Sequence, residues 1–212
     1  MTPRFRFFAL CPLLAAALLT VAAPALAQHP GGEPKGEWMH PPKQLPKPKR
    51  GDPTHDLDTL FKALKIAPDE ESAKAIENRI WAVMLVTKSD TANLLMTRVK
   101  TAVEAKDLDL AIKLLNGLIE IKPDYVEAWD RRATIYYMKK DYGHALSDIA
   151  QVLAREPRHF GALSGLGLIL QNIGDDKHAL EAYRRALAVY PRLQRIPDVV
   201  KTLSKKVEGR DI

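Results

Sequence analysis

Apolar and polar residues are distributed in three different ways along the chain. An apolar run without acidic residues extends from Phe7 to Ala23, and residues 28–53 follow it with seven prolines and few apolar side chains. From residue 56 onward, apolar side chains recur every three or four positions, which is the spacing of amphipathic helices. No segment of this last part alternates as a strand would. We therefore predict an all-α fold from residue 56 to the C-terminus.

Most of the helical part is a repeat with an offset of 34 residues. Alanines and prolines keep this spacing: Ala111, Ala145, Ala179, Pro123, Pro157 and Pro191. The offset defines three units: 92–125, 126–159 and 160–193. Each unit has two helical apolar stripes separated by a short polar turn, and its proline ends the second helix. Two helices this short cannot bury both of their apolar faces, so neighbouring pairs must stack.

The unit at 126–159 resembles a tetratricopeptide repeat. Its signature positions hold Trp129, Ala133, Tyr136, Ala145, Val152 and Pro157. The next unit matches through Leu163, Leu166, Gly167, Ala179, Tyr183, Ala186 and Pro191, and the first, more divergent unit keeps Leu95, Ala111, Leu118 and Pro123. This resemblance implies a short right-handed solenoid of stacked antiparallel helix pairs, with the first helix of each pair lining a concave groove. It also implies a scaffold or adaptor that binds another polypeptide, without enzymatic activity and without a cofactor.

The segments that flank the repeats are predicted to close the two ends of the stack. Residues 56–91 carry two apolar stripes and are interpreted as a degenerate helix pair that caps the N-terminal end. Residues 194–212 contain one amphipathic stripe with Pro197 in its first turn, and are interpreted as a capping helix and tail.

Three glycines in the first helix of the last unit call for an explanation, because a glycine inside a helix costs about 1 kcal/mol relative to alanine. Gly167 falls where the two helices of a pair approach most closely, so we expect close packing there. Gly161 and Gly165 face the predicted groove. They either bare its floor for an approaching chain or serve only to start the helix and relieve crowding.

The resemblance also assigns side chains to the groove. The candidates are Asn93, Met96, Lys100, Glu127, Asp130, Arg131, Thr134, Tyr137, Ser164, Leu168 and Gln171. The family's clamp for C-terminal carboxylates is mostly absent, because its positions hold Met96, Lys100, Arg131, Ser164 and Gly165. Chaperone-tail binding is therefore not expected. The groove is predicted to be mixed and amphipathic, with Tyr137 and Met96 as apolar anchors.

Arg98 and Arg132 share a repeat position that the family usually fills with a large apolar residue. They either pair internally, with Asp130, Glu127 or Glu104, or face the groove and bind an acidic peptide. The stretch HALSD places His144, Ser147 and Asp148 on one helical face, but without an oxyanion hole or an enclosed site it does not indicate catalysis. No metal site is expected.

Residues 1–27 are typical of a signal peptide. Two arginines precede the apolar run, and an A-x-A sequence ends at Ala27. We expect cleavage near Ala27 and export to a bacterial periplasm, with an uncleaved membrane anchor as the alternative. Cys11 is the only cysteine and lies inside the apolar run, so a cleaved chain has no thiol for a disulfide or a metal.

Residues 28–55 are predicted to form a disordered tether rich in proline and lysine. Its basic cluster from Lys43 to Arg50 suggests an alternative function, in which the tether contacts anionic lipid or cell-wall polymer at the envelope and the repeats are a spacer. Removal of Arg4 and Arg6 with the signal peptide lowers the formal net charge from +6 to +4, which is too small to indicate a nucleic-acid partner. Self-association is an open alternative.

Overall fold

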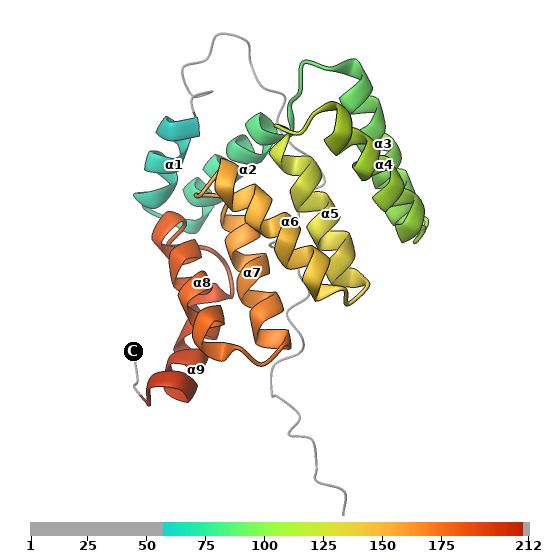
Figure 1. Cartoon of the computed structure of the whole chain (residues 1–212). Coiled ribbons are helices and arrows are strands. Elements are labelled where there is room, and N and C mark those ends of the chain that lie inside the picture. Colours follow the sequence, from blue (N-terminus) through green and yellow to red (C-terminus); the bar gives the residue numbers. More distant parts are fainter. Residues whose placement is uncertain (1–56, 210–212) are drawn as a thin grey trace, which may run out of the picture. The chain divides into compact units, whose positions relative to one another are not determined.

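The computed structural model describes residues 57–209, and all of its regular structure within that range is α-helical (Figure 1). The helices are α1 (Leu57–Lys65), α2 (Glu70–Leu85), α3 (Asp90–Glu104), α4 (Leu108–Ile121), α5 (Val126–Met138), α6 (Tyr142–Arg155), α7 (Phe160–Asn172), α8 (Asp176–Val189) and α9 (Ile196–Glu208). The all-α prediction is confirmed. The predicted signal peptide (1–27) and tether (28–55) lie outside the described residues. Within residues 57–209, every helix is too short or too polar to cross a bilayer.

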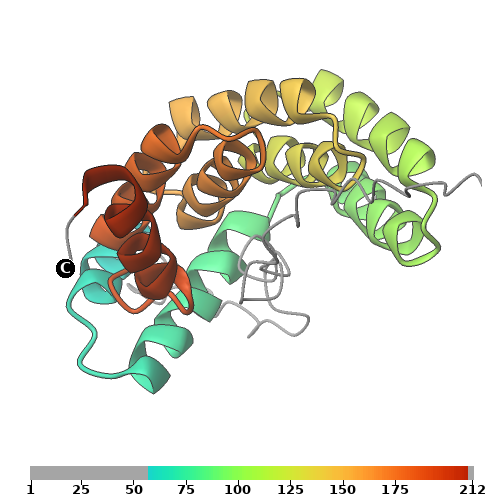
Figure 2. The same ribbon diagram turned by 90° about the horizontal axis from the view of Figure 1, so that it is seen from below.

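The repeat units form helix pairs that stack on one another. The pairs are α3 with α4, α5 with α6, and α7 with α8, and each second helix also packs against the next first helix. Figure 2 shows α4, α6 and α8 in one row and α3, α5 and α7 in a second row beneath it. We call the side of α3, α5 and α7 that points away from α4, α6 and α8 the inner face.

The turns between paired helices explain why the repeat reads so clearly in the sequence. Asp107, Asp141 and Asp175 each cap the following helix by accepting a hydrogen bond from the backbone N–H three residues later. The residue directly before each of these aspartates has a positive φ, which is 61° at Lys106, 60° at Lys140 and 85° at Gly174. One turn geometry therefore serves all three units.

The expected close approach at Gly167 is confirmed. A Cβ atom built on Gly167 would lie 2.6 Å from Cε1 of Tyr183 on α8, which is far inside van der Waals contact. The absent side chain lets the Tyr183 ring, itself fully buried, lie flat against the α7 backbone.

The C-terminal helix closes the last unit as predicted. Helix α9 packs against α8, and Ile196, Val200 and Leu203 join the apolar cluster of the last unit. Pro197 occupies the first helical turn, where its missing N–H removes no helical hydrogen bond.

The N-terminal helix pair does not occupy the predicted place. We predicted that residues 56–91 cap the stack next to the first unit, whereas α1 packs against α8 and α2 packs against α5. Leu60, Phe61, Leu64, Ile80 and Trp81 share one apolar cluster with residues of α7, α8 and α9. The prediction of an end cap is therefore wrong, because the apolar stripes of this pair are complementary to the far end of the stack.

Candidate binding face

Helix α2 lies on the inner face, where Trp81 packs over the start of α7 (Figure 2). Its indole ring meets Phe160 and His159 edge to face, with centroid distances of 5.3 Å and 5.4 Å. A Cβ atom on Gly161 would lie 3.1 Å from Cη2 of Trp81. Gly161 therefore leaves room for an approaching chain, and that chain is the protein's own second helix.

Polar contacts fix α2 in this position. The buried Glu77 carboxylate accepts hydrogen bonds from Nε1 of Trp81 at 3.3 Å and from the Tyr190 hydroxyl at 3.1 Å. The Tyr125 hydroxyl donates to the Leu85 carbonyl at 3.0 Å, at the C-terminal end of the same helix. Buried polar groups with satisfied partners specify one arrangement, so α2 is an integral part of the fold.

Helix α1 is attached to the same end of the stack by arginines. Arg158 forms an ion pair with Asp58 at 2.6 Å, and its guanidinium group lies over the Phe61 ring, 4.5 Å from the centroid. Arg192 donates hydrogen bonds to the carbonyls of Ala67 and Pro68, in the turn between α1 and α2. Arg158 thus fixes helix α1, and Arg192 fixes the turn that joins α1 to α2.

The predicted groove residues divide into buried and accessible groups. Five are buried: Glu127, Asp130, Thr134, Ser164 and Leu168. Asn93 and Lys100 are exposed, and Met96, Arg131, Tyr137 and Gln171 are half-buried. The prediction of an open groove along all three units is therefore wrong. The inner faces of α5 and α7 contribute to packing, and the accessible candidates lie mainly on α3 and α5.

Three of the buried polar side chains form a cluster between α5 and the start of α7. Nε2 of His159 lies 3.2 Å from Oε1 of Glu127, and Asp130 is adjacent, with potential ligand atoms of the three residues within 4.8 Å of one another. The other oxygens, Oε2 of Glu127 and Oδ2 of Asp130, are buried and have no hydrogen-bond partner. Two ionised carboxylates would leave these oxygens unsatisfied at a high cost in free energy.

The cluster retains protons more strongly than exposed groups would. Burial raises the pKa of Asp130 to about 6, with the Glu127 charge adding to the rise and the charges of His159 and Arg131 opposing it. Burial also opposes the charged imidazole, but the carboxylates of Asp130 and Glu127 outweigh it and raise the pKa of His159. A carboxyl group that keeps its proton is less costly to bury than a carboxylate, so the raised pKa of Asp130 lowers the cost of this cluster.

The hydrogen bonds of His159 argue against a metal ligand. Its Nδ1 accepts the backbone N–H of Ala162 at 2.9 Å and caps α7, so a neutral imidazole carries its proton on Nε2. A metal bound at Nε2 would force the imidazole proton onto Nδ1. Nδ1 could then no longer accept the Ala162 N–H, and the cap of α7 would be lost. These contacts fit a buried structural cluster better than a metal centre.

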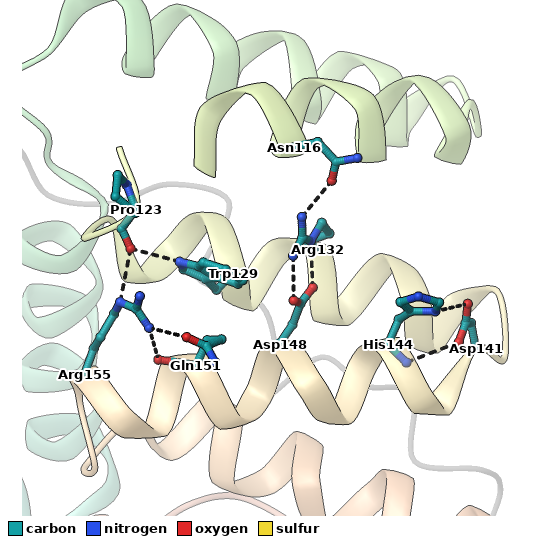
Figure 3. A network of polar contacts seen from close by, with 9 residues as sticks. All are labelled: Asn116, Pro123, Trp129, Arg132, Asp141, His144, Asp148, Gln151 and Arg155. Atoms are coloured by element: carbon teal, nitrogen blue, oxygen red, sulfur yellow. Dashed lines mark hydrogen bonds and ion pairs between the residues drawn. The ribbon is translucent and has the colours of Figure 1, made fainter. Parts of the chain in front are cut away.

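The two arginines that share one repeat position have different environments, and Figure 3 shows that of Arg132. Arg132 pairs internally, with Nε and Nη2 donating to the two carboxylate oxygens of Asp148 at 2.8 Å and 2.7 Å. Its partner is on the second helix of the unit, and is none of the three acids that we considered. Nη1 also donates to Oδ1 of Asn116 on α4 at 2.7 Å. Arg98 is exposed, and within the described part of the chain no hydrogen bond or ion pair holds it.

The side chains of the HALSD stretch serve structural roles (Figure 3). Nδ1 of His144 lies 2.7 Å from Oδ2 of Asp141, and its ring stacks on Tyr136. Both oxygens of Asp148 bind Arg132. His144 and Asp148 are therefore each committed to a different partner, and they do not form a relay through Ser147.

Comparisons with known proteins agree with this architecture. A tetratricopeptide repeat model matches residues 161–192. A TPR repeat-containing protein of Rhizobium etli is 41% identical over 157 residues, which cover 74% of this chain and 77% of that protein. Among solved structures, the first TPR of Spaghetti (RPAP3) bound to an HSP90 peptide has a TM-score of 0.54 at 19% identity, over 58% of this chain and 98% of that one. The Sgt2 TPR domain of Aspergillus fumigatus has a TM-score of 0.52 at 23% identity, over 57% and 82% of the two chains. The chain belongs to the tetratricopeptide repeat family.

Proposed function

We propose that this protein is a non-enzymatic binding module that holds a segment of another polypeptide on the accessible part of its inner face. The single observation that carries the proposal is the difference in solvent accessibility along that face. The part at α7 is filled by the protein's own α2, whereas Asn93, Met96 and Lys100 of α3 and Arg131 of α5 keep access to solvent. TPR domains commonly serve protein–protein interaction, which supports this use of the face.

The accessible part favours a short acidic segment with one apolar side chain. Lys100 and Arg131 supply positive charge, and Lys100 has only a loose ion pair with Glu104, at 3.9 Å between exposed side chains. Such pairs contribute little and exchange readily for a ligand carboxylate. The half-buried Met96 offers an adaptable apolar contact beside them.

The known peptide complex of a structural neighbour does not identify the ligand here. That neighbour is bound to an HSP90 peptide, but the similarity between the two chains supports the fold alone. In this chain most positions of the family's carboxylate clamp hold other residue types, and Ser164 is buried. The proposed ligand is therefore an internal acidic segment rather than a free C-terminus.

The proposal includes export to a bacterial periplasm after removal of residues 1–27. A signal peptide pattern and a cleaved chain without cysteine support it. Sequencing the N-terminus of the protein from the periplasmic fraction tests this part, and a start at Gln28 is expected. An intact N-terminus in the membrane fraction would instead establish the anchored alternative.

Site-specific photocrosslinking in cells tests the binding face. A photoreactive residue at Lys100 or Arg131 should capture one protein, and the same residue at His144, on the opposite side of the unit, should not. Lys100→Glu should reduce capture from Arg131. Capture that depends on residues 28–55 and spares both inner-face positions would instead support the envelope spacer function.

A further inference from the structure

Neighbouring units contact each other in the same way along the stack, and this pattern shows which side of a first helix is normally covered. Ala128 and Ile135 of α5 are buried in an apolar cluster with residues of α4. One repeat later, Ala162 and Ile169 of α7 are buried in a cluster with residues of α6. The side of a first helix that carries these positions is therefore covered by the second helix of the preceding unit.

In the first unit the corresponding positions are uncovered. Leu94 and Thr101 of α3 align with these buried pairs at an offset of 34, and Arg98 between them aligns with Arg132. All three are exposed, and Leu94 is 54% accessible despite its apolar side chain. We call Leu94, Arg98 and Thr101 the end face. None of the described helices covers it, because α1 and α2, the expected cap, pack against α5 and α8 instead.

Arg132 shows which polar partner belongs at this position. It receives a carboxylate from its own unit, Asp148, and an amide oxygen from the preceding helix, Asn116 (Figure 3). At the position of Asp148, the first unit has Leu114. Arg98 therefore has neither acceptor among the described residues. The positions equivalent to its neighbours Leu94 and Thr101 are buried in the other two units.

We propose that the end face docks an amphipathic helix of a partner protein that carries a carboxylate at its centre. The partner helix would occupy, against α3, the place that α4 occupies against α5. Its apolar side chains would cover Leu94, and its carboxylate would replace both missing acceptors of Arg98 through a bidentate pair. This surface lies about a third of a turn around α3 from Lys100 and is separate from the proposed inner-face site.

Charge argues against a second copy of the chain as the occupant. A two-fold pairing through the end face would bring Arg98 close to Arg98 of the other copy, because it lies at the centre of the face. Head-to-tail stacking would place α9, with the exposed Lys201, against the same arginine. Like charges at an interface core oppose both arrangements, whereas an acidic partner helix complements the face.

A designed peptide tests the proposal on the full chain. The probe has the sequence of residues 108–121 with Asn116→Glu, and a side-chain staple on its outer face holds it helical. In an NMR titration of the isotopically labelled protein, we expect shifts at Leu94, Arg98 and Thr101. Arg98→Glu should weaken binding at least about tenfold, which corresponds to about 1.4 kcal/mol. A probe with Asn116→Lys should recover binding to that variant.

Lys113→Glu is the matched control, since it reverses an exposed charge in the same unit, on α4, outside the end face and outside the inner-face site. Equal weakening by Lys113→Glu and Arg98→Glu would show general electrostatic attraction and overturn the proposal. Shifts confined to other helices, or an absence of binding, would overturn it as well. Concentration-dependent dimerisation that Leu94→Glu abolishes would identify a second copy as the occupant and contradict the partner helix.

Discussion

Replacing Asp130 by asparagine should stabilise the protein at neutral and alkaline pH. Asp130 is buried beside Glu127 and His159, and burial raises its pKa from the ordinary 3.8 to about 6. Between these values the folded state binds more protons than the unfolded state, so stability falls as the pH rises from about 4 to about 6.

The size of the effect follows from the pKa difference. Each pH unit across this range costs about 1.4 kcal/mol for one proton, and the rise of the Asp130 pKa from 3.8 to about 6 gives a total of about 3 kcal/mol. Asparagine has nearly the same shape and does not ionise, so it avoids the cost of burying a charge. The variant should therefore exceed the parent by about 2–3 kcal/mol at pH 8 and match it near pH 4.

Urea unfolding between pH 4 and pH 8, followed by far-ultraviolet circular dichroism, measures this difference. The slope of free energy against urea should stay constant, so that midpoint shifts report stability alone. Glu120→Gln on the exposed side of α4 is the control and should follow the parent at every pH. A variant that is less stable than the parent at pH 8 would show instead that a partner stabilises the ionised Asp130.

Three further substitutions test the packing of the stack, each by urea unfolding at pH 7. Gly167→Ala should cost about 1–3 kcal/mol, because the new methyl group meets the Tyr183 ring at 2.6 Å, and Tyr183→Leu in the same chain should recover part of it. Trp81→Ala should cost about 3–5 kcal/mol, since a fully buried indole is lost from the contact between α2 and α7; a cost below about 1 kcal/mol would show that α2 is not docked there. Asp148→Asn should cost about 3 kcal/mol by leaving the half-buried Arg132 without its carboxylate, and additional replacement of Arg132 by methionine should restore stability; an additive loss would contradict the pairing.

The repeat could be predicted because its geometry is local and recurs. Asp107, Asp141 and Asp175 mark identical turns, and Gly167 reflects a contact between neighbouring helices of one unit. Alignment of the units at one offset brings such features into register. The fold class and the packing of these helix pairs follow directly from that register.

The position of α2 could not be predicted, because no repeat relates residues 57–85 to the helices they contact. Glu77 bonds to Tyr190, which is 113 residues away, and nothing in either local sequence indicates the other. Gly161 was the available signal. A glycine on the inner face indicated a closely approaching chain, but not that the chain was α2.

The partner of Arg132 was missed for a related reason. Asp148 lies 16 residues away on the facing helix, whereas acids close in sequence or on neighbouring first helices were considered. Two antiparallel helices of one unit bring such pairs together, and the repeat alone gives their register only approximately. Arg98 shows the same limit from the other side. It shares the repeat position of Arg132 but is exposed, because Leu114 stands where Asp148 stands in the next unit.

The attachment of α1 and α2 to the last unit changes how the stack should open. A simple repeat array has contacts only between neighbours and can unfold from either end. Here Asp58 bonds to Arg158 across 100 residues and Ala67 to Arg192 across 125, so the C-terminal end is closed by the start of the chain. Helices α3 and α4 pack mainly on each other and on α5. The least protected amides in hydrogen exchange should therefore lie in residues 90–121, in the middle of the sequence, while both flanking segments open together at higher free energy.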